Sequence, residues 1–442
     1  MQLKFNYRKY LSNSLIRASM WTAGGFVAAQ FLRLLSNLIL TRLVQPEAFG
    51  LMAIVTVVIV GIEMMTDLGI NTSIVQNRRG DDREFIDTAY TLKIIRGGLM
   101  AAIVAGLALP LANFYNQPDL TYLLPAVAIL VVISGFGSNA LAVAARRLWL
   151  GRATAITIAA QLASAVVAIA CAIVWPNVWA LIAGYAASTV SFTILSHLVF
   201  PNFTSRMGWS RQAAWEIIGF GKWMFITSIL VFVAGQADKL VLARLVPISE
   251  LGIYSIAFMW AHLPVTAAQT WFGRMIFPMA SEEFRKAEPD YRRLKRYRRH
   301  FLIAVVAVMV ILSIAFDTVF HILYTPEYWP ATAFFRVLLA GAMVRILDES
   351  YRAYNLASGA PQYTAYGSAM TAAVFFATVG HFFGQFGTVG VALAYSVSQA
   401  GTFVVSAAGT RRQGVSDYGF DAIIILCLAV AIVTGFHIRG GA

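Results

Sequence analysis

The sequence predicts an all-α polytopic membrane protein made of two six-helix bundles that are related by an internal repeat, with one extra C-terminal transmembrane helix. The first observation is composition: 59% of the 442 residues are hydrophobic, 12% are charged, and the mean hydropathy is +0.70. Soluble domains are about 45–50% apolar and about 25% charged. The second is the recurrence of apolar runs of roughly 20 residues, the length that crosses a bilayer. The third is a stretch of the first half that returns in the second.

The spans are predicted in order along the chain. The first follows a basic segment with Lys4, Arg8, Lys9 and Arg17. Its apolar run is too long for the hydrophobic region of a signal peptide and lacks a small-residue cleavage site, so we expect a permanent span. Twelve spans are predicted at residues 19–41, 48–70, 88–112, 121–145, 153–175, 178–200, 217–246, 251–276, 300–323, 331–351, 363–384 and 388–409, and a weaker thirteenth at 420–437.

The orientation of these spans follows from the basic residues. Most of the 34 Lys and Arg residues lie in the N-terminal segment and in the connections after even-numbered spans. Cytoplasmic loops are enriched in Lys and Arg, so the N-terminus is predicted to be cytoplasmic. The net charge of +13 is thus a topology signal, and no nucleic-acid partner is expected. The largest polar insertion, residues 281–299, is expected to be a solvated inside loop or a short amphipathic helix on the inner leaflet.

The internal repeat defines the domain organisation. Residues 38–54 match residues 240–256 without gaps, and each stretch contains an Arg-Leu-Val sequence followed at equal distance by a Gly, Gly50 or Gly252. Each half contains an even number of spans, so the two bundles have parallel orientation, as in transporters whose halves rock around a central site. We predict an N-terminal bundle at 1–210, a C-terminal bundle at 211–412, and a tail at 413–442 with the thirteenth helix.

Ionisable groups inside the spans mark candidate functional positions, because each costs about 2.5–3.5 kcal/mol at the bilayer centre on insertion scales. Those near a predicted span end, such as Asp67, Lys93 and Glu349, are expected to reach the interface. The candidates are Arg33, Glu63, Asp67, Lys93, Arg96, Asp238, Lys239, Arg336, Arg345, Asp348 and Glu349.

Arg33 lies well inside the first span, and Gln30, Arg33 and Asn37 form one polar stripe at i, i+3 and i+7. The equivalent helix of the second half carries Gln236, Asp238 and Lys239, and later spans carry Arg96 and Arg336. We predict a cationic cavity formed by Arg33, Arg96, Lys239 and Arg336, with Gln30, Asn37, Gln236 and Asp238 as its polar lining. Guanidinium groups bind a phosphate or diphosphate bidentately. Internal pairing, for example of Glu63 with Arg96 or Asp238 with Lys239, is the alternative.

Other chemistry has little support in the sequence. The six histidines are scattered without a metal-binding spacing, and His262 is expected to be a hydrogen-bonded contact between helices. There is no Walker motif and no GxGxxG, so no cofactor is predicted. Asp81 and Asp82 are flanked by Arg79 and Arg83, which favours a salt-bridged loop over a glycosyltransferase metal site. The two cysteines, Cys171 and Cys427, lie inside apolar runs and indicate no disulfide framework.

A family resemblance rests on the repeat residues. Residues Gln236 to Val246 followed by Leu251 to Ala257 resemble the Asp-Lys and Leu-Gly-Ile-Tyr signature of the polysaccharide biosynthesis and export family. These are Wzx-type flippases of the multidrug/oligosaccharidyl-lipid/polysaccharide superfamily. Thr41 to Gly50 and Thr66 to Ile70 are similar to the family's first helical hairpin, and Leu323 to Thr332 resembles its tenth span. Many members carry two further spans, whereas this sequence offers one candidate after the twelfth.

The resemblance implies a function. It implies alternating-access movement of an undecaprenyl-diphosphate-linked oligosaccharide across the bacterial inner membrane for O-antigen, capsule or exopolysaccharide assembly. It would place Arg33, with Arg96, Lys239 and Arg336, around the diphosphate. Membrane lipids and the polymerase or export machinery would be its partners.

Three alternatives remain open from the sequence. A drug/cation antiporter of the same superfamily would require acidic groups in the cavity, where the first span has Arg33. A lipid II flippase is poorly separated by sequence. A membrane glycan polymerase or glycosyltransferase would need a large outside loop with carboxylates or His, and the predicted outside loops are short.

Overall fold

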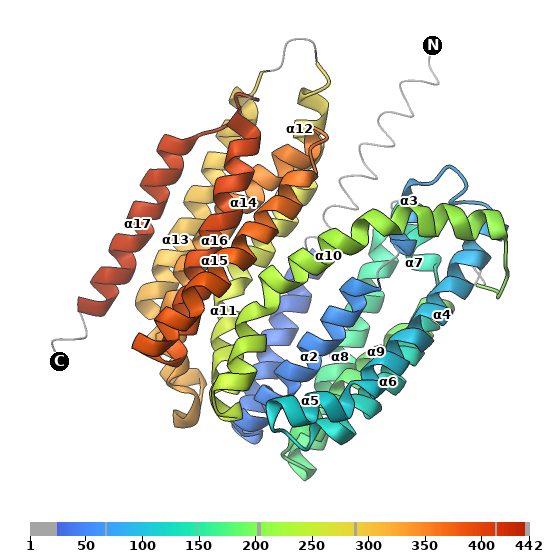
Figure 1. The fold of residues 1–442 in the computed structure, drawn as a ribbon, viewed down its shortest axis with the longest axis horizontal. Helices are drawn as coiled ribbons and strands as arrows, with labels where there is room; N and C mark the ends of the chain where they lie inside the picture. The colour runs from blue at the N-terminus through green and yellow to red at the C-terminus, as the bar shows by residue number, and fades with distance from the viewer. Residues whose placement is uncertain are drawn as a thin grey trace. The chain divides into compact units, whose positions relative to one another are not determined.

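The computed structural model describes residues 24–66, 69–147, 149–200, 205–286, 290–411 and 413–437, and the regular elements within these ranges are all helices. The predicted basic N-terminal segment lies outside them. The chain splits into two compact units, Met1–Ser228 and Ile229–Ala442. Figure 1 shows the helices of both units, coloured from blue at the N-terminus to red at the C-terminus.

Unit 1 begins with the helix Gly24–Leu43. It continues with α2 (Pro46–Met65), α3 (Ile70–Gln76), α4 (Arg83–Gly106), α5 (Ala108–Tyr115), α6 (Leu120–Gly135), α7 (Ala140–Arg146), α8 (Leu150–Val174), α9 (Val178–Leu198) and the first part of α10 (Arg211–Leu245). Within this unit α4 packs along α6 and α8 packs along α9.

Unit 2 contains the rest of α10 and then α11 (Ile248–Trp271), the π-helical turn η1 (Phe272–Ile276), α12 (Phe277–Glu283), α13 (Arg292–Leu323), the 3-10 turn η2 (Pro326–Tyr328), α14 (Ala331–Ala357), α15 (Gln362–Phe386), α16 (Thr388–Arg411) and α17 (Tyr418–His437). Here α14 packs against α11 and α16, and α15 packs along α16.

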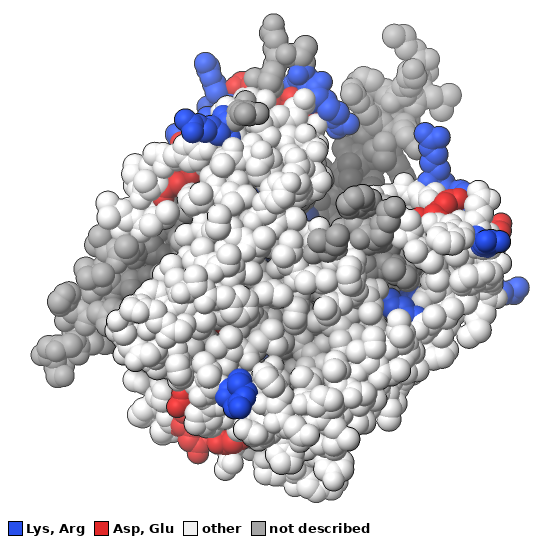
Figure 2. All heavy atoms as spheres, in the orientation of Figure 1, with Lys and Arg blue, Asp and Glu red and all other residues white. Residues whose placement is uncertain are grey.

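Each predicted span coincides with helix in the structure. Nine described helices are long and apolar enough to cross a membrane, or ten if the bent pair α6 and α7 is one span. The helix α14 is not among them because it carries five ionisable groups, Arg336, Arg345, Asp348, Glu349 and Arg352. The described surface in Figure 2 accordingly carries no Lys, Arg, Asp or Glu over most of the face drawn. The expected all-α membrane architecture is confirmed.

Two predicted spans are interrupted, which the sequence did not indicate. The span 88–112 divides into α4 and α5, and the span 121–145 into α6 and α7. The last pair bends by 54°. Broken helices occur at membrane depth only where protein or a water-filled cavity satisfies the freed backbone groups.

The structure supports the repeat at its two matching helix ends. The first described helix ends at Leu43 and α2 begins at Pro46, while α10 ends at Leu245 and α11 begins at Ile248. Both pairs of residues have the same offset along the chain. The amide of Val44 donates to the Leu40 carbonyl at 2.8 Å, and the amide of Val246 donates to the Leu242 carbonyl at 3.1 Å. The repeated sequence therefore forms the same turn twice.

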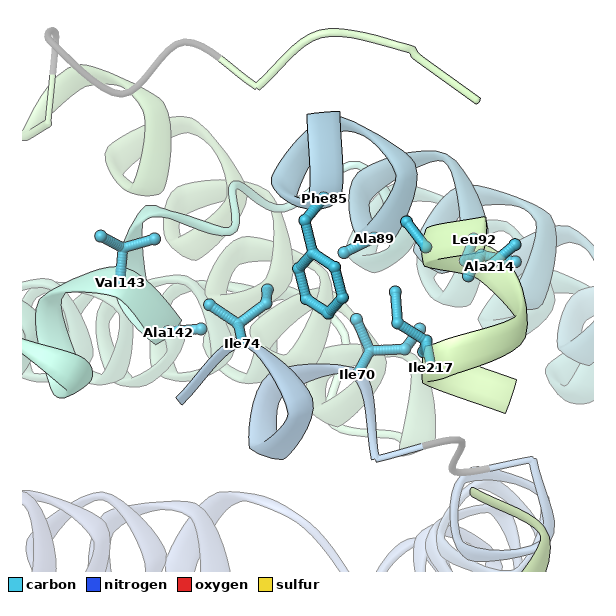
Figure 3. Packing of buried hydrophobic residues seen from close by; sticks show 10 residues of the cluster. Ile70, Ile74, Phe85, Ala89, Leu92, Ala142, Val143, Ala214 and Ile217 are labelled. Carbon is cyan, nitrogen blue, oxygen red and sulfur yellow. The ribbon is translucent and has the colours of Figure 1, made fainter. Parts of the chain in front are cut away.

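The first part of α10 belongs to unit 1 because it completes a hydrophobic core there (Figure 3). The core consists of Ile70, Ile74, Phe85, Ala89, Leu92, Ala142, Val143, Ala213, Ala214 and Ile217, from α3, α4, α7 and α10. The carboxylate of Glu216 adds polar contacts, accepting from Asn77 Nδ2 at 3.0 Å and from Arg79 Nη1 at 3.2 Å. The two units divide inside α10, between Ser228 and Ile229.

The polar insertion at 281–299 is neither a loop nor a separate interfacial helix over most of its length. The helix α12 ends at Glu283, and α13 already begins at Arg292. The basic residues from Arg292 to Arg299 therefore form the first turns of a 32-residue helix. Arg, Lys and Leu have high helix propensity and continue the helix beyond its apolar part.

The predicted thirteenth helix forms as α17 and packs along α13. Arg298 of α13 is fully buried, and its guanidinium Nη2 lies 2.6 Å from Asp421 Oδ1. Arg298 Nε donates to Ser350 Oγ at 2.9 Å, and Tyr351 donates its hydroxyl to Asp421. One buried ion pair thus ties the C-terminal helix to the rest of unit 2.

Candidate functional site

Arg33 lies on the helix Gly24–Leu43, and its side chain is exposed. The neighbouring Gln30 and Asn37 are half-buried on the same helix. Large apolar side chains on this helix are also exposed, including Phe31 at 63%. Arg33 makes no ion pair within the described part of the chain. It is therefore a guanidinium in the middle of an apolar helix with its charge available to a ligand.

Arg96 on α4 is held by the end of α2. Its Nη2 donates to the backbone carbonyl of Glu63 at 2.8 Å, and its Nε donates to Thr66 Oγ1 at 3.2 Å. The structure thus brings together the predicted neighbours Glu63 and Arg96. The printed contacts run through a carbonyl and a hydroxyl, which hold the guanidinium at the end of α2.

Lys93, one turn before Arg96, is half-buried and contacts another part of unit 1. Its ammonium donates at 2.9 Å to the carbonyl of Gly137, in the break between α6 and α7. The preceding carbonyl, that of Phe136, accepts from the Tyr90 hydroxyl at 3.2 Å and lies 2.8 Å from His197 Nε2. These side chains satisfy the carbonyl groups that the 54° bend frees. Asp67, also expected at an interface, lies outside the described residues.

In unit 2, Asp238 and Lys239 form the internal pair that was the alternative to a free cavity. Asp238 is fully buried and accepts a 2.6 Å hydrogen bond from the Tyr254 hydroxyl. Lys239 Nζ lies 3.5 Å from Asp238 Oδ2 and 3.4 Å from the centre of the Phe258 ring. A cation above an aromatic face is stabilised by the ring quadrupole. Gln236, the remaining polar residue predicted here, is half-buried on the same helix.

His262 is a contact between helices, as its position in the sequence indicated. Its ring stacks on Phe258 with 3.8 Å between ring centres, and its Nε2 lies 3.2 Å from the Tyr395 hydroxyl. These contacts join α11 to α16. Because Lys239 lies over the same Phe258 ring, they also connect both helices to the pair of Asp238 and Lys239 on α10.

Arg336 on α14 forms an ion pair with Asp317 on α13. Both side chains are largely buried, at 16% and 11% exposure. The sequence does not indicate Asp317 as the partner, because the two residues are 19 positions apart on different helices. The charge of Arg336 is thus balanced within unit 2.

Two arginines and two carboxylates form a row of ion pairs further along the same helix. Arg345 lies 3.7 Å from Asp348 and 3.4 Å from Glu349, and Arg352 Nε donates to Glu349 Oε2 at 2.9 Å. Gln269 of α11 donates to Glu349 Oε1 at 2.9 Å. Asp348 and Glu349 are buried at 0% and 2% exposure, so Glu349 does not reach an interface. The spacing of i, i+3, i+4 and i+7 is the sequence signal for this row.

The Asp81–Asp82 segment is the salt-bridged loop that the sequence favoured. Asp81 Oδ2 lies 2.9 Å from Arg146 Nε, and Asp81 Oδ1 lies 2.9 Å from Arg147 Nη2. Hydrogen bonds from Arg147 and then Arg146 lower the pKa of Asp81 below its ordinary value. No group of His, Cys, Asp and Glu suited to a metal ion occurs among the described residues.

Helices that are long and apolar enough to cross a membrane, together with the duplicated helix ends, define a multi-pass membrane protein with an internal repeat. A family model described as polysaccharide biosynthesis protein matches residues 39–333, which is more than half of the chain. The chain belongs to this family.

Individual relatives agree with the family. The chain is 25% identical over 300 residues to lipopolysaccharide biosynthesis protein WzxC of Escherichia coli (strain K12), covering 68% of this chain and 60% of the relative. It is 24% identical over 241 residues to succinoglycan biosynthesis transport protein ExoT of Rhizobium meliloti (strain 1021), covering 54% of this chain and 48% of the relative. The matches thus span about half to three fifths of these relatives.

One solved structure shows the shared fold over nearly the whole chain. The lipid II flippase MurJ in an inward closed conformation superposes with a TM-score of 0.67, covering 96% of this chain and 98% of MurJ, at 11% sequence identity. Identity this low supports a common fold and leaves substrate open.

Proposed function

We propose that this protein flips an undecaprenyl-diphosphate-linked oligosaccharide from the inner to the outer leaflet of the bacterial inner membrane by alternating access. Its N-terminus would be cytoplasmic, and the product would feed O-antigen, capsule or exopolysaccharide assembly. The observation that carries the proposal is Arg33, an exposed guanidinium on an apolar helix in a member of the polysaccharide biosynthesis family. Polymerase or export proteins would receive the flipped lipid.

The chemistry of the substrate fits such a group. A diphosphate carries several anionic oxygens, and arginine can bind a phosphate with two parallel N–H donors. An arginine in a span is expensive unless it faces water, a partner or a ligand. A diphosphate that passes along the helix would supply that ligand transiently.

The contacts rank the four predicted cations. Lys239 and Arg336 each have a carboxylate partner within unit 2, and Arg96 is anchored by a carbonyl and a hydroxyl. We therefore assign Arg33 the main role in diphosphate binding and Arg96 a supporting one. Arg336 has a structural role as well, because its loss would leave Asp317 buried without its partner.

Two other functions are weaker candidates. A drug/cation antiporter needs a carboxylate available to a cation, and Glu349 is already engaged by Arg345, Arg352 and Gln269. A lipid II flippase is the stronger second candidate, because the fold matches MurJ. It differs from the leading proposal in the group that is attached to the lipid diphosphate.

The test is translocation in proteoliposomes of a fluorescent undecaprenyl-diphosphate oligosaccharide, measured as the fraction that an external glycosidase can cleave. We expect Arg33→Ala to lower the initial rate at least ten-fold, and Arg33→Lys to recover part of it because the charge returns without the bidentate geometry. Arg78→Ala, in an inside loop, is the control and should leave the rate unchanged. Equal rates for wild type and Arg33→Ala would contradict the assignment of Arg33.

A further inference from the structure

A cavity of about 180 Å³ lies inside unit 2, between the end of α11, the π-helical turn η1 and the last turns of α14. Its lining includes Gln269, Phe272, Gly273, Phe277, Glu349 and Arg352. Gly273 and Phe277 are exposed, so the cavity opens at the surface of the described chain. None of these residues belongs to the cationic site predicted around Arg33.

The wall of the cavity is built from fixed polar groups. Glu349 is 2% exposed, and its two oxygens are held by Gln269, Arg345 and Arg352. Arg352 uses Nε and Nη2 for this contact, which leaves its Nη1 donors for a ligand. The buried carboxylate thereby fixes the orientations of Gln269 and Arg352, as a preorganised binding site requires.

The opposite wall is apolar and owes its shape to the π-helical turn. A π-helical turn widens the helix locally and is frequent at functional sites. Here it lies between Trp271 and Phe277, and it places Phe272, Gly273 and Phe277 around the cavity. A Cβ atom added at Gly273 would meet nothing within 4 Å, so the space beside this residue is open.

The charges on the polar wall indicate a neutral ligand. Arg345 and Arg352 are balanced by Asp348 and Glu349, so the row has no net formal charge and attracts an anion only weakly. A hexose ring presents hydroxyl groups that donate and accept hydrogen bonds, together with an apolar C–H face that packs on an aromatic ring. The volume is below the roughly 300 Å³ at which pockets for drug-sized ligands begin, and it suits a group of about one ring.

We infer that this cavity binds a single sugar ring of the transported glycan, with Gln269 and Arg352 as hydrogen-bonding groups and Phe277 as the stacking surface. This inference rests on the proposed function, which supplies the glycan. It gives unit 2 a role in recognising the sugar, and this role is separate from binding of the diphosphate at Arg33.

The test uses the purified full chain in nanodiscs and a panel of methyl glycosides of glucose, galactose, mannose and N-acetylglucosamine, with methyl phosphate as the anionic probe. Saturation-transfer difference NMR detects such weak ligands. Gly273→Leu adds a side chain to the lining of the cavity and should lower the signal of the bound glycoside at least five-fold, and the smaller Gly273→Ala should lower it less. Gly98→Leu is the matched control, because Gly98 is also an exposed helical glycine with open space around it. Its signal should equal that of wild type.

Three results would overturn the inference: no glycoside signal with wild type, an undiminished signal with both Gly273 variants, or a Gly273-sensitive signal from methyl phosphate alone. The same preparations are then tested for translocation. If wild type binds a glycoside in a Gly273-dependent way but moves no lipid-linked oligosaccharide, the proposed function fails and the sugar site stands. If wild type moves the lipid and Gly273→Leu changes neither binding nor rate, the sugar site fails and the proposed function stands.

Discussion

Replacing Asp421 with alanine removes the anionic partner of a fully buried arginine. In the native chain Arg298 and Asp421 are 2.6 Å apart, with side-chain exposures of 0% and 2%. The Tyr351 hydroxyl also donates to Asp421 and would lose its acceptor. The variant therefore leaves a buried guanidinium without its carboxylate and a buried hydroxyl without an acceptor for its proton.

The expected cost follows from the burial of both groups. Breaking a buried ion pair from one side destabilises a protein by about 3–5 kcal/mol, because the remaining charge is left desolvated. The neighbouring pair gives the matched control: Arg299 Nε lies 2.6 Å from Asp417 Oδ2, but Arg299 is 49% exposed. Exposed pairs contribute about 0.2–1 kcal/mol. Asp417→Ala should therefore cost several-fold less than Asp421→Ala.

The assay is reversible unfolding in mixed detergent micelles, followed by circular dichroism, for wild type, Asp421→Ala, Arg298→Met and the double variant. The double variant should be more stable than the sum of the single losses implies, because removing both charges leaves neither unpaired. Our interpretation would be refuted if Asp421→Ala and Asp417→Ala had the same small effect, or if the two single losses simply added.

Two further predictions concern unit 1. At the crossing of α4 and α6, a Cβ added at Gly97 would lie 3.1 Å from the Gly135 Cα. Gly97→Leu should therefore destabilise the folded protein by about 1–3 kcal/mol through overpacking. Gly98→Leu should be nearly neutral in the same unfolding assay, because a Cβ added there meets nothing within 4 Å. The lowered pKa of Asp81 means that its contribution to stability is complete above its unperturbed pKa of about 3.9 and is lost as the pH falls through the lower folded-state value. Asp81→Asn should therefore show a smaller drop in melting temperature between pH 6 and pH 3 than wild type. An equal drop would count against a stabilising pair with Arg147.

The helices could be predicted from the sequence because an apolar run of about 20 residues has few alternatives in a bilayer. The repeat was visible because the matching turn must end one helix and begin the next in both halves. The bend between α6 and α7 could not be predicted, since it depends on Lys93, Tyr90 and His197 reaching its carbonyl groups from other helices.

The partners of the charged groups were less accessible to sequence reasoning. Arg298 stands in a run of basic residues that looks uniformly exposed, and its acceptor Asp421 is 123 positions away. Asp317 and Arg336 likewise meet only when α13 and α14 pack. The sequence supports the pair of Asp238 and Lys239 only as the alternative to a free cavity, and it does so because the two residues are neighbours in the chain.

The most direct test of the central claim is the initial translocation rate of wild-type protein in proteoliposomes that contain both a fluorescent undecaprenyl-diphosphate oligosaccharide and a differently labelled lipid II. We predict that the oligosaccharide reaches the outer leaflet at least ten-fold faster than in protein-free vesicles, and faster than lipid II. Equal movement of the oligosaccharide in vesicles with and without protein would contradict the proposed function, and faster movement of lipid II would assign the chain to the second candidate.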